Sequence, residues 1–450
     1  MTDNANAHNQ AVAVIGAGPA GLYAARLLAE AGHPVALLNR DIKLGGLAEY
    51  GIFHNKHKMK NGLRKQFRGL MESDNLHYFG NLVVGNAGDL TLDDLRGLGF
   101  AAVLVTVGAQ GTKWLGLEGE DLRGVYHAKD IVYHYNQLPP YAEQEYPFGR
   151  RVALVGVGNV MIDIANYCIH DLKVDEVTAA ARRGPADVKF TKKEMSLVAA
   201  NLDLAHLESE IERSRAVLAS VGQDPDAAKA FILSALDKAE PKDSETVFRL
   251  DFLASPTRIL GEGGQVTGLE VEETTLEPRP GGGESKSVGL GTHRIIACDT
   301  VVFCIGDRVD ASFGLPLDKW QEFAKHPEPR YPREGWSYEA WDPQTGQAIE
   351  GTFVAGWARE ASSGLVGTAR KDGENGGEAV LHYLATTPTA GNPGALAALE
   401  ARLNGLGKPV VRKPDWQRLE EFEARQAAEK GLEFFKFSSN AEMLAAIGLK

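Results

Sequence analysis

The stretch that decides the fold is Val12-Ala13-Val14-Ile15-Gly16-Ala17-Gly18-Pro19-Ala20-Gly21. An apolar run of strand type leads directly into three spaced glycines, and a helical pattern follows them. Glycines at these positions permit a tight turn and let the backbone approach a pyrophosphate at the start of the helix. We therefore expect a Rossmann-type unit here, with the pyrophosphate of a dinucleotide beside Gly16, Gly18, Pro19 and Gly21.

A second fingerprint of the same kind is Val152-Ala153-Leu154-Val155-Gly156-Val157-Gly158-Asn159-Val160-Met161. It also joins an apolar strand-type run to a helical pattern, although Met161 stands where a small residue is usual. Two such units in one chain predict an α/β protein with two Rossmann-like dinucleotide-binding domains. A flavin and a nicotinamide held face to face for hydride transfer would need this arrangement.

The two units differ at the end of the strand that follows each fingerprint, where the adenosine ribose binds. The strand-type run 176–181 ends in Arg182-Arg183, and two guanidinium groups suit the 2′-phosphate of NADPH. The run 35–38 ends in Asn39-Arg40, and Asn39 stands where an acid is usual but can still hydrogen-bond a ribose. We therefore assign NADPH to the second unit and FAD to the first.

Composition and cysteine content limit the possible functions. A chain of 450 residues is long enough for two domains, and its formal net charge of −12 argues against nucleic acid as a partner. No apolar run approaches the ~20 residues of a membrane span. The three cysteines form no Cys-x-x-Cys pair, which excludes a redox-active disulfide or an iron–sulfur cluster ligated by this chain and fits the reducing cytoplasm.

Two buried-strand patterns, 99–109 and 300–307, set the expected domain boundaries. Such strands end the nucleotide sheets of two-dinucleotide flavoproteins and carry the chain between domains. We therefore expect the NADPH domain, 110–308, to be inserted into an FAD domain formed by 11–109 and 309–450. The polar residues 1–10 lack the pattern of a secretory signal and are expected to be a disordered tail.

The run Arg182-Arg183-Gly184-Pro185-Ala186-Asp187-Val188-Lys189-Phe190-Thr191-Lys192-Lys193-Glu194 resembles the NADPH site of adrenodoxin reductase-type ferredoxin–NADP reductases. Gly156 to Asp163 resembles that family too, as do Ala355-Gly356-Trp357 and the C-terminal tail. The resemblance extends over essentially the whole chain. It implies FAD and NADPH as cofactors and transfer of electrons to an acidic ferredoxin or a flavodoxin.

The resemblance also implies roles for individual residues. Trp357 would lie by the isoalloxazine, and Asp163 is a candidate for orienting groups near the nicotinamide. A helix dipole alone also favours an acid in a first turn such as that of Asp163. The implied FAD site comprises Gly16, Gly18, Pro19, Gly21, Asn39, Arg40, Gly46, Leu47, Val84, Gly108, Gly356, Trp357, Gly364, Leu365 and Val366. The implied NADPH site comprises Gly158, Asn159, Val160, Arg182, Arg183 and Glu194.

The sequence departs from the family in four places. Asn39 replaces a Glu, Met161 replaces a small residue, Lys56 takes the place of a histidine, and the segment 359–363 replaces the family's Lys-Arg-Gly-Pro-Thr. The last departure puts the hydrogen bonds at the flavin edge in question.

The stretch 54–68 carries six basic residues and no acid, which is unusual in an acidic protein. A solvated helix face is one interpretation of this pattern. The other is a docking surface for an acidic ferredoxin close to the flavin. Its residues are Lys56, Lys58, Lys60, Arg64, Lys65 and Arg68; a second basic set is Lys189, Lys192 and Lys193.

Three other functions remain open from the sequence. A glutamate synthase small chain shares the two-unit architecture, but it carries a cysteine-rich segment ahead of the first strand, where about ten residues stand here. A flavin monooxygenase or quinone reductase would oxidise NADPH without preferring ferredoxin. A flavoprotein retained for binding or redox sensing would hold FAD that NADPH does not reduce.

Overall fold

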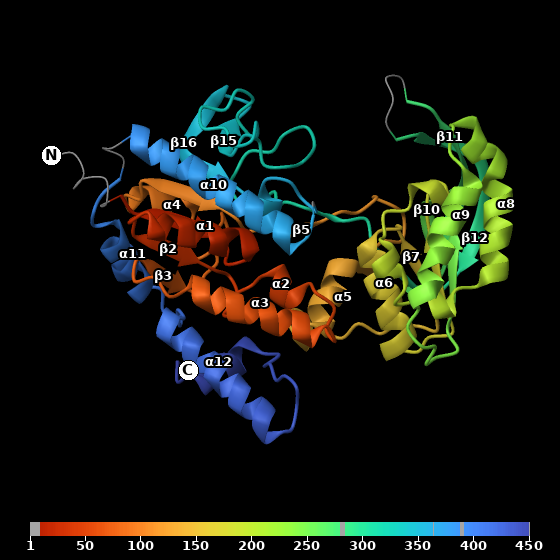
Figure 1. The fold of residues 1–450 in the computed structure, drawn as a ribbon, viewed down its shortest axis with the longest axis horizontal. Coiled ribbons are helices and arrows are strands. Elements are labelled where there is room, and N and C mark those ends of the chain that lie inside the picture. The colour runs from red at the N-terminus through yellow and green to blue at the C-terminus, as the bar shows by residue number, and fades with distance from the viewer. Residues whose placement is uncertain (1–9, 280–283, 363, 388–390, 450) are drawn as a thin grey trace. The chain divides into compact units, whose positions relative to one another are not determined.

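The computed structural model describes residues 10–279, 284–362, 364–387 and 391–449, which form two compact units (Figure 1). The first unit contains residues up to Thr112, Tyr133–Glu143 and Asp307 onward, and the second contains Lys113–Val132 and Gln144–Gly306. Of the expected tail, residues 1–9 lie outside the described residues. Gln10 is buried and its side chain donates a 2.8 Å hydrogen bond to the Thr387 carbonyl, so Gln10 is wrongly included in a disordered tail.

The first unit is built on a six-stranded sheet in the order β15-β16-β4-β1-β2-β3. All neighbours are parallel except β15 and β16. The central strands are buried along their whole length, because helices cover both faces and leave no solvated side. The strands are β1 (Val12–Ile15), β2 (Val35–Leu38), β3 (Leu76–Phe79), β4 (Ala102–Val105), β15 (Glu339–Asp342) and β16 (Gln347–Val354).

Successive side chains of β1 enter two different cores, as the alternation of a strand requires. Val12 and Val14 pack with the helices of one face, and Ala13 and Ile15 pack with those of the other. The first face carries α1 (Pro19–Glu30), α3 (His57–Leu70), α10 (Val366–Thr386), α12 (Lys413–Glu429) and α13 (Asn440–Ala446). The second face carries α4 (Leu92–Gly97) and α11 (Ala395–Asn404).

Helix α10 lies directly against α1, as Figure 1 shows, because glycines line its contact face. A Cβ on Gly373 would lie 2.2 Å from the Ala20 carbonyl oxygen, and one on Gly377 would lie 2.9 Å from Leu27. Larger residues at these positions would force the helices apart. This close packing fixes the start of α10 relative to the first fingerprint, which begins α1.

The second unit combines a parallel sheet, in the order β6-β13-β7-β8-β9, with an antiparallel sheet, in the order β10-β11-β12. The parallel strands are β6 (Val125–His127), β7 (Arg151–Val155), β8 (Glu176–Ala180), β9 (Val247–Asp251) and β13 (Thr300–Phe303). The antiparallel strands are β10 (Ala254–Glu262), β11 (Gln265–Glu277) and β12 (Lys286–Ala297). The helices of this unit include α6 (Asn159–Asn166), α7 (Lys192–Met195), α8 (Leu204–Ser220) and α9 (Pro225–Leu233).

Two short antiparallel strands of the first unit, β5 (Gly111–Thr112) and β14 (Asp307–Arg308), pair where the chain first leaves this unit and where it last returns to it. The segment Tyr133–Glu143 also lies in the first unit. By the sequence pattern, this segment belongs to the inserted domain, 110–308. Its Tyr133 and Leu138 share an apolar cluster with Tyr50. No helix within the described residues is long and apolar enough to cross a membrane.

Candidate functional site

The first fingerprint contains two kinds of glycine. Gly16 has a φ of +107°, and a Cβ there would lie 2.6 Å from the Thr106 carbonyl oxygen. A Cβ on Gly21 would lie 1.8 Å from the Gly16 carbonyl oxygen, so both residues are required by the packing of β1, α1 and β4. Gly18 differs, because its backbone is extended and no described atom beyond its two chain neighbours lies within 4 Å of an added Cβ. The fold itself therefore leaves space above Gly18.

That space lies beside the first turn of α1, whose N-cap is Gly18 and whose first residue is Pro19. Backbone N–H groups in the first turn of a helix lack partners within the helix and can bind an anion. Gly46, with a φ of +49°, lies against it, since a Cβ there would be 3.1 Å from the Gly18 Cα. The two glycine segments form a backbone-lined cradle that fits a pyrophosphate.

Thr106 and Asn39 brace this loop, and the sequence identified only the second. The Thr106 hydroxyl contacts the carbonyl oxygens of Ile15 and Gly16, each at 2.9 Å. The Asn39 side-chain oxygen accepts a 3.0 Å bond from the Ala17 N–H, and its amide nitrogen donates to the carbonyls of Asp41 and Lys43. Asn39 thus shapes the loop, and its contact with a ribose stays a prediction.

A second part of the expected flavin site precedes α10. Gly356, with a φ of +64°, donates its N–H to Asp372 at 2.6 Å, and Arg359 pairs with the same carboxylate at 2.7 Å. Arg359 is the first residue of the segment that departs from the family pattern, and it is almost completely buried over the Tyr338 ring. Its role is to hold Asp372 and hence the backbone just before Trp357.

The start of α10 is open. Gly364 and Leu365 are exposed, and Leu365 keeps 76% of its surface accessible, which is high for an apolar residue at a helix N-cap. Val366 is half-buried as the first residue of α10. An apolar helix start of this kind suits contact with a flat ring, and the contact of these residues with the flavin stays a prediction.

Four other residues of the expected FAD site lie in different parts of the first unit. Val84 is buried in the core on the α4 side of the sheet, and Gly108 has a φ of +72° after β4. Leu47 begins the short helix α2 (Leu47–Tyr50) and packs against the cluster of Tyr50, Tyr133 and Leu138. Arg40 donates to Asp41 and Gln110, each at 2.9 Å.

The second fingerprint repeats the geometry of the first. Gly156 has a φ of +119°, and a Cβ there would lie 2.6 Å from the Cys304 carbonyl oxygen. At Gly158 the backbone is extended and no described atom beyond its two chain neighbours lies within 4 Å of an added Cβ. Met161, at the third position, is completely buried between helix and sheet. The second loop therefore also leaves open space at its middle glycine.

Hydrogen bonds from backbone N–H groups connect residues 182–194, called the basic segment here, to this loop. The Lys189 N–H donates to the Val157 carbonyl, and the Thr191 N–H donates to the Asn159 side-chain oxygen, each at 2.9 Å. Thr191 caps α7 by accepting from the Glu194 N–H. These contacts unite residues 156–159 with 182–194, as a single nucleotide site requires.

Two further residues of the expected NADPH site lie at the surface. Arg182 is exposed, and Val160 is 41% exposed on the first turn of α6. Asp163 is the fifth residue of α6, and its first turn contains no acid. The interpretation of Asp163 as a first-turn acid favoured by the helix dipole is therefore wrong, and its role near the nicotinamide stays a prediction.

All three cysteines are buried and none forms a disulfide. Burial raises the pKa of each thiol, that of Cys298 to about 12. Protonated, enclosed thiols cannot act as nucleophiles at neutral pH. The structure therefore exposes none of the three thiols for a dithiol–disulfide reaction.

The predicted docking surface is wrong for two of its six members. Lys60 and Arg64 lie on the buried face of α3, and Arg64 pairs with Glu49 at 2.7 Å. The Arg64 guanidinium also lies 3.6 Å from the centre of the Phe434 ring. A sequence that shows no acid within 54–68 cannot reveal that Glu49 and the C-terminal segment cover this face.

The other basic residues of that helix are arranged differently. Lys58, Lys65 and Arg68 are exposed, Arg68 being paired with Glu420 at 2.6 Å, and Lys56 is half-buried. A basic surface on α3 is therefore smaller than the sequence predicts.

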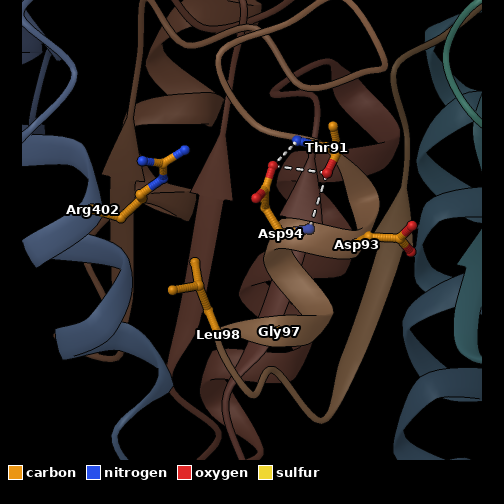
Figure 2. A pocket seen from close by; sticks show the side chains of 6 residues that line it. All are labelled: Thr91, Asp93, Asp94, Gly97, Leu98 and Arg402. Atoms are coloured by element: carbon orange, nitrogen blue, oxygen red, sulfur yellow. Dashed lines mark hydrogen bonds between the residues drawn. The ribbon is translucent and has the colours of Figure 1, made fainter.

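A pocket of about 380 Å³ lies elsewhere in the first unit, between α4 and α11 (Figure 2). Figure 2 shows the hydrogen bonds by which Thr91 and Asp94 cap α4, with Arg402 of α11 also lining the pocket. None of the expected cofactor residues lines it. It forms no part of the candidate site.

Comparison with known proteins supports the same interpretation. Residues 10–205 match the family described as pyridine nucleotide-disulphide oxidoreductase. The NADPH-ferredoxin reductase FprA of Mycobacterium tuberculosis is 27% identical over 493 residues, covering 97% of this chain and 99% of FprA. The mitochondrial NADPH:adrenodoxin oxidoreductase of Drosophila melanogaster is 28% identical over 467 residues, covering 97% and 93%.

Among solved structures, Mycobacterium tuberculosis FprA in complex with NADPH matches with a TM-score of 0.79 and 25% sequence identity. The match covers 98% of this chain and 100% of the FprA chain. The resemblance predicted from the sequence is thereby confirmed. This chain is homologous, over nearly its whole length, to the NADPH-ferredoxin and NADPH:adrenodoxin reductases.

Proposed function

We propose that this protein is an FAD-dependent NADPH–ferredoxin reductase, with FAD on the first unit and NADPH on the second. The observation that carries the proposal is the pair of open glycines, Gly18 and Gly158, each in a loop whose first glycine is enclosed by the fold. The second loop alone is tied to a segment with Arg182 and Arg183. One unit thus suits a dinucleotide without a 2′-phosphate and the other suits one with it.

In the first unit, the chain's residues bind and orient the flavin. The first turn of α1 offers backbone N–H groups to the pyrophosphate beside Gly18. Trp357, Gly364 and Leu365 provide an apolar surface for the ring system, and Asp372 fixes the Gly356 backbone that precedes it. FAD, when bound, couples the two-electron chemistry of NADPH to the one-electron chemistry of an iron–sulfur protein.

In the second unit, the chain's residues select the coenzyme. The first turn of α6 takes the pyrophosphate beside Gly158, and Arg182 and Arg183 take the 2′-phosphate. Asp163 lies one turn further along α6 and is the candidate for orienting the nicotinamide end. Asn159 acts through Thr191 and keeps the basic segment beside the loop.

We infer that the partner is an acidic ferredoxin or flavodoxin and that it uses the exposed basic side chains of α3. Lys58 and Lys65 are exposed in a chain whose net charge is −12, so an acidic partner needs a local positive surface. The three reduced, buried cysteines suit a reducing compartment such as the cytoplasm.

The experiment that tests this function compares electron acceptors under anaerobic conditions with NADPH as donor. Holoprotein is mixed with NADPH and one acceptor at a time: a [2Fe–2S] ferredoxin, a flavodoxin or a quinone. The proposal predicts the highest kcat/KM for an iron–sulfur protein or flavodoxin. Efficient quinone reduction with no turnover of either protein would favour the quinone reductase instead.

A further inference from the structure

A glutamate occupies the anion position of the basic segment in the second unit. Glu284 precedes β12, and one of its carboxylate oxygens lies 2.6 Å from the Arg183 guanidinium. Its other oxygen pairs with the Lys189 ammonium. A single carboxylate thus bridges the two cations, with Asp187 also 3.7 Å from Arg183.

The fold holds Glu284 in this place. The hydroxyls of Thr274 on β11 and Ser287 on β12 both donate to the Arg182 carbonyl at 2.8 Å, which fixes the β11–β12 pair against the basic segment. Ser285, the next residue along the chain, is buried. Lys189 is in turn fixed to the glycine loop through its backbone. The bridge therefore joins anchored elements.

A carboxylate and a phosphate monoester compete for the same donors, because both accept charge-assisted hydrogen bonds from Arg and Lys. Hydrogen bonds from Lys189 and then Arg183 lower the pKa of Glu284 to about 2, so its charge persists at neutral pH. A phosphate carries more charge, about −1.5 to −2 at pH 7. The phosphate is therefore able to displace the carboxylate.

We propose that Glu284 is a specificity-determining residue that the 2′-phosphate of NADPH must displace from Arg183 and Lys189. This rests on the proposed function, in which that segment binds the 2′-phosphate. Glu284 weakens NADPH binding and leaves NADH binding unaffected, because NADH carries no group that competes for the cations. The Glu284 side chain is 51% exposed, so its two ion pairs lie in the range of surface pairs and correspond to a roughly three- to tenfold effect on affinity.

The test is calorimetric titration of the FAD-loaded protein with adenosine 2′,5′-bisphosphate and with 5′-AMP. Glu284→Gln should lower the Kd of the bisphosphate about three- to tenfold and leave that of 5′-AMP unchanged. Glu262→Gln, which removes the charge of an exposed glutamate at the end of β10, is the matched control and should change neither value.

An unchanged or raised Kd of the bisphosphate in Glu284→Gln, with the unmodified protein still preferring it over 5′-AMP, would overturn this inference alone. Equal affinity of the unmodified protein for the two nucleotides would overturn the NADPH site and this inference together. The two failures are therefore distinguishable in one set of titrations.

Discussion

The substitution Gly18→Val should remove FAD without unfolding the protein. Gly18 has φ −77° and ψ −179°, which valine readily adopts, and no described atom beyond its two chain neighbours lies within 4 Å of an added Cβ. The new side chain would fill the space that the structure leaves for the pyrophosphate. Each lost hydrogen bond to a charged group costs about 1.5–3 kcal/mol, so losing two costs about 3–6 kcal/mol. This weakens FAD binding by roughly 10²- to 10⁴-fold.

The assay is the ratio of flavin to protein absorbance after purification, followed by titration of the apoprotein with FAD. Gly158→Val is the matched control, since it makes the same change in the second loop and should give yellow protein that no longer binds NADPH. Gly21→Ala provides the opposite comparison, because its Cβ would lie 1.8 Å from a backbone oxygen and should lower the melting temperature.

Stoichiometric FAD binding by Gly18→Val with an unchanged Kd would refute the assignment of the pyrophosphate to Gly18. That assignment is also refuted if Gly158→Val loses the flavin while Gly18→Val keeps it, since that would exchange the two assignments. A Gly18→Val protein that melts far below the unmodified apoprotein would show that the position is structural.

Three more predictions concern single interactions. Arg182→Ala with Arg183→Ala should raise the KM for NADPH at least about tenfold and leave that for NADH unchanged; equal effects on both would contradict the phosphate assignment. Burial lowers the pKa of Lys60 from 10.5 to about 7, so the unfolded chain binds more protons between these values and stability rises with pH across that window. Lys60→Met should therefore raise the unfolding free energy by about 2–4 kcal/mol at pH 6, with the gain vanishing near pH 10 in urea titrations; a pH-independent change would contradict it. Reversing Lys58 and Lys65 to Glu should raise the KM for ferredoxin several-fold at low salt, and unaltered ferredoxin turnover would place docking elsewhere.

The sequence predicted those parts of the fold whose determinants are local. Each fingerprint combines an apolar run, a glycine turn and a helix start within about ten residues, so β1 and β7 were recognisable as strands. The sequence did not predict which glycines of a fingerprint are enclosed by the fold and which leave space for a ligand. Only the structure shows that Gly21 is enclosed by Gly16 whereas Gly18 faces open space.

Predictions from the sequence were wrong or missing where a side chain contacts a residue that is distant in the chain. The sequence predicts that Arg64 is an exposed base, but in the structure it pairs with Glu49 and packs on the Phe434 ring. The segment Tyr133–Glu143 lies within the inserted stretch, yet it packs in the first unit because its apolar residues meet Tyr50. Glu284 pairs with Arg183, which is 101 positions away, and no local pattern marks that contact.

The most direct test of the account is anaerobic stopped-flow reduction of the bound flavin by NADPH and by NADH. We predict that NADPH bleaches the FAD absorbance near 450 nm stoichiometrically, and that kred/Kd for NADH is lower by about tenfold or more. FAD that NADPH leaves oxidised would contradict the proposed NADPH-dependent reductase, and equal kred/Kd for both coenzymes would contradict the NADPH site at Arg182 and Arg183.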